Sequence, residues 1–76
     1  MARYFFHIRE DDQIEEDLEG IDLPNLAAVQ EEALQAAREI VAELVVQGEQ
    51  IGKKRFEIVD ENGDIIAVYP ISAVVK

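Results

Sequence analysis

The chain has no cysteine or tryptophan, and only one histidine and two prolines among its 76 residues. Without cysteine, neither a disulfide nor a thiolate zinc site can form, so packing has to stabilise the fold. A lack of cysteine also suits the cytoplasm, where disulfides are rare. No apolar run approaches the ~20 residues of a membrane span, and the N-terminus reads as a strand instead of a signal peptide. We therefore expect a cytoplasmic protein.

Basic residues are scarce as well, at 7 against 17 acidic residues, which gives a formal net charge of −10. Residues 10–22 alone hold eight acids and no base. Nucleic-acid phosphates and anionic membranes repel such a chain. We expect no nucleic-acid partner and no membrane partner; a basic protein is the kind of partner that the acidic 10–22 segment would attract.

The length predicts one domain over residues 1–76, near the lower limit for a self-sufficient hydrophobic core. A hydrophobic fraction of 49% argues against disorder. Dimerisation would add to the packing that so small a core provides.

A long amphipathic helix is predicted over residues 25–47. Its apolar side chains fall on one arc of about 180°, as in a helix laid across a sheet. Asn25 can cap the start, and Gly48 can close the end in the left-handed conformation. At roughly 33 Å the helix exceeds strands of about 23 Å. One end must therefore overhang, be covered by the C-terminal tail, or pack on a second subunit.

Two strands are predicted before this helix. Residues 3–9 are rich in aromatic side chains and form the first strand. Alternation directs Tyr4, Phe6 and Ile8 to the core. A second strand over residues 13–17 would form a hairpin with the first through a turn at residues 10–12.

Two further strands, residues 53–60 and 64–70, follow the helix and permit two registers. A two-residue turn at Asn62 and Gly63 would leave Ile66 and Val68 facing out. A type I turn over residues 60–63, closed by a glycine bulge, shifts the pairing by one residue. It places Phe56 opposite Val68 and Ile58 opposite Ile66. Burial of these bulky residues favours the bulge.

The fold class is therefore α+β, a two-layer β-β-α-β-β arrangement in which the helix covers one face of a mostly antiparallel four-stranded sheet. The tail, residues 71–76, is either a helical turn or a fifth edge strand over the overhanging helix. The other sheet face stays uncovered, which usually marks a contact surface. In this register it holds Phe5, His7, Arg9, Arg55, Glu57, Val59, Ile65, Ala67 and Tyr69. The candidate interaction face within it is Phe5, His7, Val59, Ile65 and Tyr69.

Candidate chemical groups are few. His7 could act in acid–base catalysis or bind a metal, but no second histidine, cysteine or serine arrangement accompanies it, so a polar strand residue is the better interpretation. The acidic run lacks the spacing of a calcium loop. Asp60, Asn62 and Asp64 begin like an EF-hand, but Ile71 occupies the twelfth position. We expect no catalytic, cofactor or metal site, and no enzyme.

The basic cluster Lys53–Arg55, with Arg3 and Arg9, lies near aromatic residues as in proteins that bind single-stranded nucleic acid. The net charge opposes that interpretation. We expect these bases to pair with the acidic segment, within the chain or across subunits.

Three segments together resemble a family of short, single-domain alphaproteobacterial proteins of unknown function. These are the Arg-Tyr-Phe-Phe-His motif at residues 3–7, Leu23-Pro24 before an Ala/Glu-rich helix, and the run at residues 55–61 before a glycine turn. The resemblance covers essentially the whole chain and implies a bacterial, cytoplasmic protein without an assigned activity.

A second likeness is to HicB-type antitoxins, in which an acidic Leu-Pro segment precedes a Glu-Glu-Ala-Leu helix, as at residues 22–24 and 31–34 here. Those proteins place three strands before the helix, where the sequence predicts two. We thus expect a non-enzymatic module that forms a homodimer through the open sheet face or the helix overhang. The alternative is an antitoxin-like regulatory partner of another bacterial protein.

Overall fold

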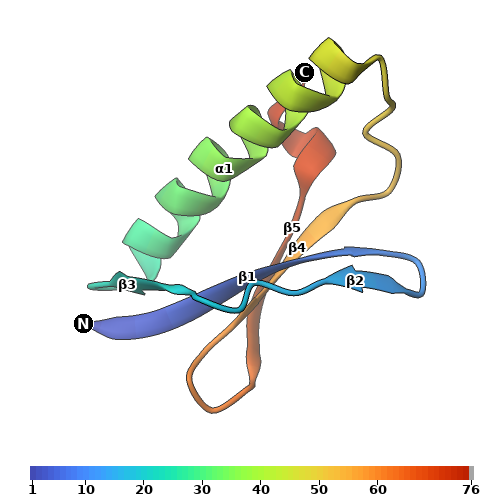
Figure 1. Ribbon diagram of the computed structural model, residues 1–76. Helices are drawn as coiled ribbons and strands as arrows, with labels where there is room; N and C mark the ends of the chain where they lie inside the picture. Colours follow the sequence, from blue (N-terminus) through green and yellow to red (C-terminus); the bar gives the residue numbers. More distant parts are fainter. Residues whose placement is uncertain (76) are drawn as a thin grey trace.

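The computed structural model describes residues 1–75 and shows a long helix crossing one face of an antiparallel sheet (Figure 1). In chain order the elements are β1 (Ala2–Glu10), β2 (Gln13–Glu15), β3 (Ile21–Leu23), α1 (Leu26–Gln47), β4 (Arg55–Val59), β5 (Ile65–Pro70) and the 3-10 helix η1 (Ile71–Val74). The predicted α+β class is confirmed. The sheet has five strands, because β3 adds to the four that were predicted.

The sheet runs in the order β2-β1-β4-β5, and β3 also pairs with β1. β2 pairs with residues 8–10 of β1, whereas β3 pairs with residues 2–4. Between these two ladders, three residues of β1 lie opposite five residues, 16–20, of the neighbouring segment. β2 and β3 are therefore two halves of one edge strand, interrupted by a loop. β3 escaped prediction because it has only three residues between Gly20 and Pro24.

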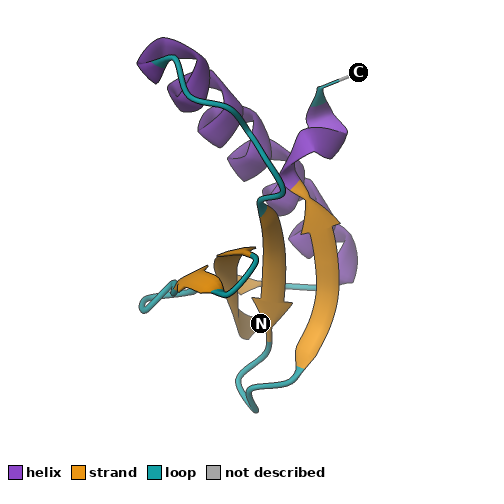
Figure 2. Ribbon diagram, turned by 90° about the vertical axis from the view of Figure 1, so that its right-hand side faces the viewer, coloured by secondary structure: helices purple, strands orange, loops and turns teal. Residues whose placement is uncertain are grey.

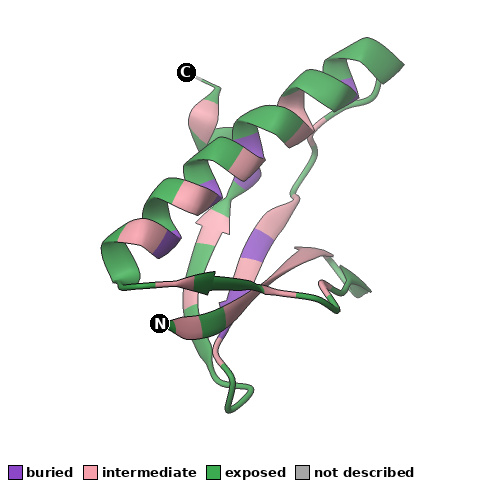
Figure 3. Cartoon of the chain, turned by 60° about the vertical axis from the view of Figure 1, so that its left-hand side comes forward, coloured by how far each residue is buried: buried purple, intermediate pink, exposed green. Residues whose placement is uncertain are grey.

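The core lies between the N-terminal half of α1 and the central strand β4 (Figure 3). Val29, Ala33 and Ala37 recur at helical spacing and are buried against Phe56 and Ile58. The two alanines permit a close approach of the helix to the sheet. The side chains that were predicted to turn toward the core from β1, Tyr4, Phe6 and Ile8, do pack against this cluster.

Both predicted helix boundaries are confirmed. Asn25 Oδ1 accepts a hydrogen bond of 2.8 Å from the Ala28 amide, which satisfies one of the free donors of the first turn. Gly48 ends the helix at φ 73°, and its amide donates to the Val45 carbonyl at 3.1 Å. Within residues 1–75, no helix has both the length and the apolarity to cross a membrane.

Ile71–Val74 of the C-terminal tail form the helical turn that was one of its two predicted forms; residue 76 lies outside the described residues. Ile71 of η1 is fully buried, at 0% exposure, within the cluster formed by α1 and β4. The tail thus covers the middle of α1. In the last turn of α1, Leu44 is buried at 8% exposure, whereas Val45 and Val46 face solvent at 71% and 82%.

The turn between β4 and β5 has the predicted type I geometry with a glycine bulge. The Gly63 amide donates to the Asp60 carbonyl at 3.0 Å, the Asp60 amide donates to the Asp64 carbonyl at 3.0 Å, and Gly63 has φ 84°. A positive φ at the last turn residue is the reason for glycine there.

The register beyond this turn was predicted wrongly. Val59 pairs with Ile65 as expected. A β-bulge then leaves Ile66 unpaired, so that Ile58 pairs with Ala67 instead of Ile66. The slip of one residue exchanges the two faces of β5. Ala67 and Tyr69, which were assigned to the open face, therefore pack against the core. Conversely, Ile66 and Val68 are exposed on the open side.

We predict that Ile71→Ala lowers the free energy of unfolding by about 2–5 kcal/mol, because it leaves a cavity under the helix. The matched control is Ile14→Ala, which truncates the same side chain at an exposed position of β2, on the other edge of the sheet, and should change stability by less than about 1 kcal/mol. Urea denaturation monitored by circular dichroism measures both. Equal losses for the two variants would contradict the placement of the tail in the core.

Candidate interaction surface

The face of the sheet away from α1 carries four of the five residues that were predicted for an interaction face. Strand pairing and alternation place Phe5, His7, Val59 and Ile65 there, whereas Tyr69 lies on the helix side. We call this surface the open face. Its residues are Phe5, His7, Arg9, Arg55, Glu57, Val59, Ile65, Ile66 and Val68.

One end of the open face is charged. Glu57 Oε2 forms two ion pairs, with Arg9 Nε at 2.9 Å and with Arg55 Nη2 at 3.4 Å. The Glu57 side chain is only 12% exposed, so both guanidinium groups enclose it. These two arginines thus pair with a strand neighbour and not with the acidic 10–22 segment.

Two other bases pair with that segment, as expected. Arg3 Nε lies 3.0 Å from Asp22 Oδ1, and Lys54 Nζ lies 3.3 Å from Glu10 Oε1. The hydrogen bond and charge of Arg3 hold the pKa of Asp22 below its ordinary value. The side chains of both pairs are partly exposed, from 28% to 50%, and exposed ion pairs contribute little to stability. They nevertheless fix the two ends of the acidic segment to β1 and β4.

The other end of the open face is apolar and reaches the outer edge of β5. Val59 is 8% exposed, and its strand partners are Phe5 and Ile65. Ile65, Ile66 and Val68 follow on β5 with exposures of 58%, 37% and 49%. We call these three residues the β5 strip. Branched apolar side chains at these exposures remain in contact with water and would be stabilised by a covering surface.

Residues 16–20, here called the Asp17 loop, cover the β1 part of the open face. The Asp17 carboxylate accepts a hydrogen bond from the Phe6 amide at 3.1 Å through Oδ2. Its Oδ1 accepts from the amides of Gly20 and Glu19 at 3.1 and 3.3 Å. The Phe6 amide lies between β2 and β3, where no strand pairs with β1. Asp17 therefore substitutes for the missing strand partner.

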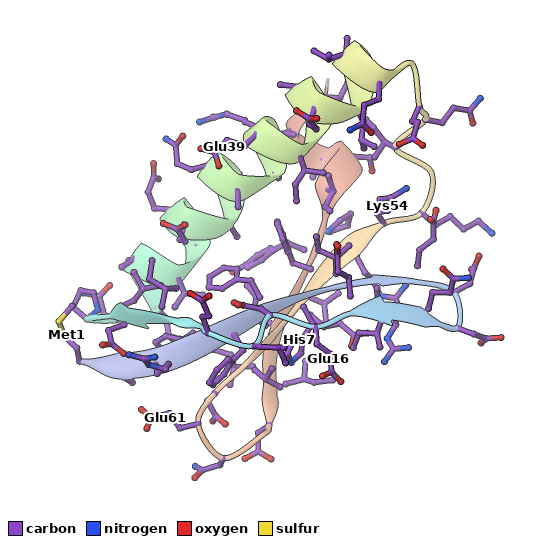
Figure 4. All side chains as sticks on the ribbon, in the orientation of Figure 1. Met1, His7, Glu16, Glu39, Lys54 and Glu61 are labelled. Carbon is purple, nitrogen blue, oxygen red and sulfur yellow. The ribbon has the colours of Figure 1, made fainter. Side chains whose placement is uncertain are left out.

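His7 takes part in the same arrangement as a hydrogen-bond acceptor. The Asp17 amide donates to His7 Nδ1 at 3.0 Å, and the imidazole stacks beside Phe5 with ring centroids 6.5 Å apart. His7 and Glu16 lie on the side of the sheet away from α1 (Figure 4). Through this hydrogen bond, His7 Nδ1 holds the backbone of the Asp17 loop in place. This role matches the interpretation of His7 as a polar strand residue.

The pKa of Asp17 lies below its ordinary value. Burial of the carboxyl raises this pKa, but the hydrogen bonds from the amides of Phe6, Gly20 and Glu19 together lower it by more. Hydrogen bonds to the ionised form stabilise that form. Sequence reasoning missed Asp17, because it is one acid among eight and its partners lie on distant backbone.

Gly20 closes the loop at a point where a side chain does not fit. Its φ is +70°, and a Cβ there would lie 2.8 Å from the Phe5 ring and 2.9 Å from the Tyr4 carbonyl oxygen. The loop thus presses its backbone onto the Phe5 ring.

The hollows of the described chain are small or shallow. An apolar hollow of about 60 Å³ lies between α1, β5 and η1 and includes Tyr69 in its lining, far below the ~300 Å³ of a typical ligand pocket. Two shallower hollows, of about 270 and 310 Å³, adjoin the β1–β2 hairpin and are lined partly by Glu10 and Gln13. Across residues 1–75, no group of three or more His, Asp or Glu side chains is arranged to hold a metal ion. The β5 strip, by contrast, gathers three exposed branched apolar side chains at the edge of the sheet.

A comparison with protein families finds a match to the model of a domain of unknown function, DUF6894, over residues 3–72. No curated protein and no solved structure matches the chain. The expected membership in a family of unknown function is thereby confirmed.

We predict that the stabilising contribution of Asp17 is pH-dependent. A carboxyl whose pKa is lower in the folded chain stabilises the fold above its unfolded pKa, near 3.9, and loses that effect as the pH falls through the folded pKa. Asp17→Asn should therefore be less stable than wild type at pH 7, with a difference that narrows below about pH 4. Thermal unfolding across pH 2.5–7 measures it. Asp12→Asn, at the exposed hairpin turn, is the control, and an equal pH effect there would contradict the assignment.

We predict that Gly20→Ala destabilises the fold more than Gly48→Ala. Both positions have positive φ, but nothing lies within 4 Å of a Cβ at Gly48. Gly48→Ala should therefore lower the free energy of unfolding by about 1–2 kcal/mol from backbone strain alone. Gly20→Ala adds overlap with the Phe5 ring and the Tyr4 carbonyl, which should cost about 1 kcal/mol or more in addition. Chemical denaturation compares the two, and equal losses would show that the loop does not press on Phe5.

Proposed function

We propose that this chain, which belongs to the DUF6894 family of domains of unknown function, is a non-enzymatic interaction module that associates with itself. The observation that carries the proposal is the β5 strip, where three branched apolar side chains are exposed at the edge of the sheet. A contiguous exposed apolar patch on a soluble protein is a common mark of a contact surface.

The size of the molecular surface supports self-association. The described fold exposes 5242 Å², whereas a compact monomer of 8.6 kDa should expose about 4,700 Å². Its radius of gyration is 12.3 Å, against about 11.4 Å for 76 compact residues. The excess reflects a helix that extends beyond its sheet and a sheet with one uncovered face.

The setting that we propose is the bacterial cytoplasm. It rests on the resemblance of the opening Arg-Tyr-Phe-Phe-His motif to alphaproteobacterial proteins and on the absence of cysteine. The acidic 10–22 segment, on the opposite edge of the sheet, keeps such a module soluble and selects against nucleic acid.

Light scattering coupled to size-exclusion chromatography tests the proposal. Wild type should elute at about twice 8.6 kDa, and the mass should fall on dilution. Ile65→Glu places a charge in the β5 strip and should give a monomer, whereas Val46→Glu, on the exposed helix overhang, should remain a dimer. Phe5→Glu is unsuitable, because Phe5 lies against Gly20. A wild type that is monomeric at its highest soluble concentration would contradict self-association.

An antitoxin-like regulatory partner of another bacterial protein is the second candidate. Three strands precede the helix, as in HicB-type antitoxins, although β2 and β3 are halves of one interrupted edge. The exposed acids of residues 10–22 would then contact a basic protein. A monomeric wild type that binds a basic host protein through this segment would favour the second candidate over the first.

A further inference from the structure

The two edges of the sheet differ in length and charge. On one edge β2 and β3 have three residues each and lie within the acidic 10–22 segment. The other edge is β5, which has six residues and no charged side chain. Soluble proteins usually shorten, charge or cover an edge strand, because its free backbone groups can pair with another chain. β5 is neither short nor charged, and it lies at the outer side of the sheet (Figure 2). Its edge is interrupted only near its two ends, by the bulge at Ile66 and by Pro70, which leaves Val68 between them.

The backbone groups that face outward from β5 can be identified. The Ile71 amide donates to the Lys54 carbonyl at 3.0 Å, so this pair is hydrogen-bonded. In an antiparallel ladder the bonded pairs alternate, and Tyr69 and Ala67 therefore direct their backbone groups to β4. Val68 directs its groups to the free edge, as does Ile66 when the alternation is carried one residue past Ala67, into the bulge opposite Val59. Pro70 also faces outward but has no amide hydrogen.

We propose that a second copy of this chain pairs with β5 in antiparallel orientation, with the two-fold axis at Ala67. In this register Ile66 exchanges hydrogen bonds with the partner's Val68, and Val68 exchanges them with the partner's Ile66. An axis at Val68 would instead set Ile66 against a proline, which cannot donate. The inference rests on the proposed self-association and specifies its surface and register.

The distribution of charge identifies a second copy as the occupant. Two chains of net charge −10 repel each other, so their contact has to use a surface without acids. Residues 65–76 contain no acidic residue, and β5 lies on the opposite side of the sheet from β2. Pairing of two β5 strands thus joins the neutral edges and keeps the two acidic edges at the far ends of the joint sheet. A two-fold axis also places the β5 strips of the two copies in contact with each other, as an isologous dimer requires.

Side chains add to this contact on the open face. Ile66 and Val68 are 37% and 49% exposed, and the proposed register places each beside the other across the axis. The strip is smaller than the ~800 Å² per partner of a standard interface. We therefore expect a dimer that dissociates on dilution.

Disulfide formation by Ala67→Cys tests the register. The chain has no native cysteine, and at the axis two residues of a non-hydrogen-bonded pair have Cα atoms about 4.5 Å apart, within the range of a disulfide. Mild oxidation should convert most of the variant to a covalent dimer on a non-reducing gel. Val46→Cys, on the helix overhang, should remain monomeric on the gel.

A matched pair of substitutions tests the surface independently. Val68→Lys should abolish the dimer in light scattering, whereas Val46→Lys should not, and circular dichroism verifies that both variants are folded. A wild-type dimer that survives Val68→Lys and gives no cross-link with Ala67→Cys would overturn this inference and leave self-association intact. A wild-type monomer would overturn both.

Discussion

Burial of Phe56 and Ile58 on the central strand β4 is the constraint on which the rest of the fold depends. Both side chains are at most 2% exposed, and they contact α1 and η1 on one face of the sheet. A chain of 76 residues has too few apolar side chains to build a second such cluster. The small side chains of Ala33 and Ala37 bring the helix onto these two residues, and Ile71 fills the space beside them. The C-terminal tail is therefore part of the core.

The local features were predictable from the sequence because their causes are local. Asn25 and Gly48 define the helix ends through their own backbone geometry and nearest amides. The turn at residues 60–63 likewise follows from an aspartate at its start and a glycine at its end. In the same way, alternation in β1 directed Tyr4 to the core without knowledge of its neighbours.

The register of β5 could not be predicted, because it depends on a packing choice between two strips of similar polarity. Sequence reasoning buried Ile66 and Val68 because they are bulky. The structure buries Ala67 and Tyr69 instead, and passes over Ile66 to do so. A small residue opposite Ile58 leaves room for the helix and for η1, which two bulky β5 residues would occupy. The candidate face lost Tyr69 for this reason and acquired Ile66 and Val68.

The two edges of the sheet differ in how their free backbone groups are satisfied. At the β1 edge the Phe6 amide lacks a strand partner, and the Asp17 carboxylate supplies one from within the chain. Satisfying a backbone donor with an ionised side chain also introduces charge and a bulky loop, and both prevent another strand from docking there. At the β5 edge no acid is available in residues 65–76, so the outward groups of Ile66 and Val68 are left to water or to another chain. Acidic residues thus close one edge, and their absence leaves the other edge open, which is the edge where we propose that two copies of this acidic chain meet.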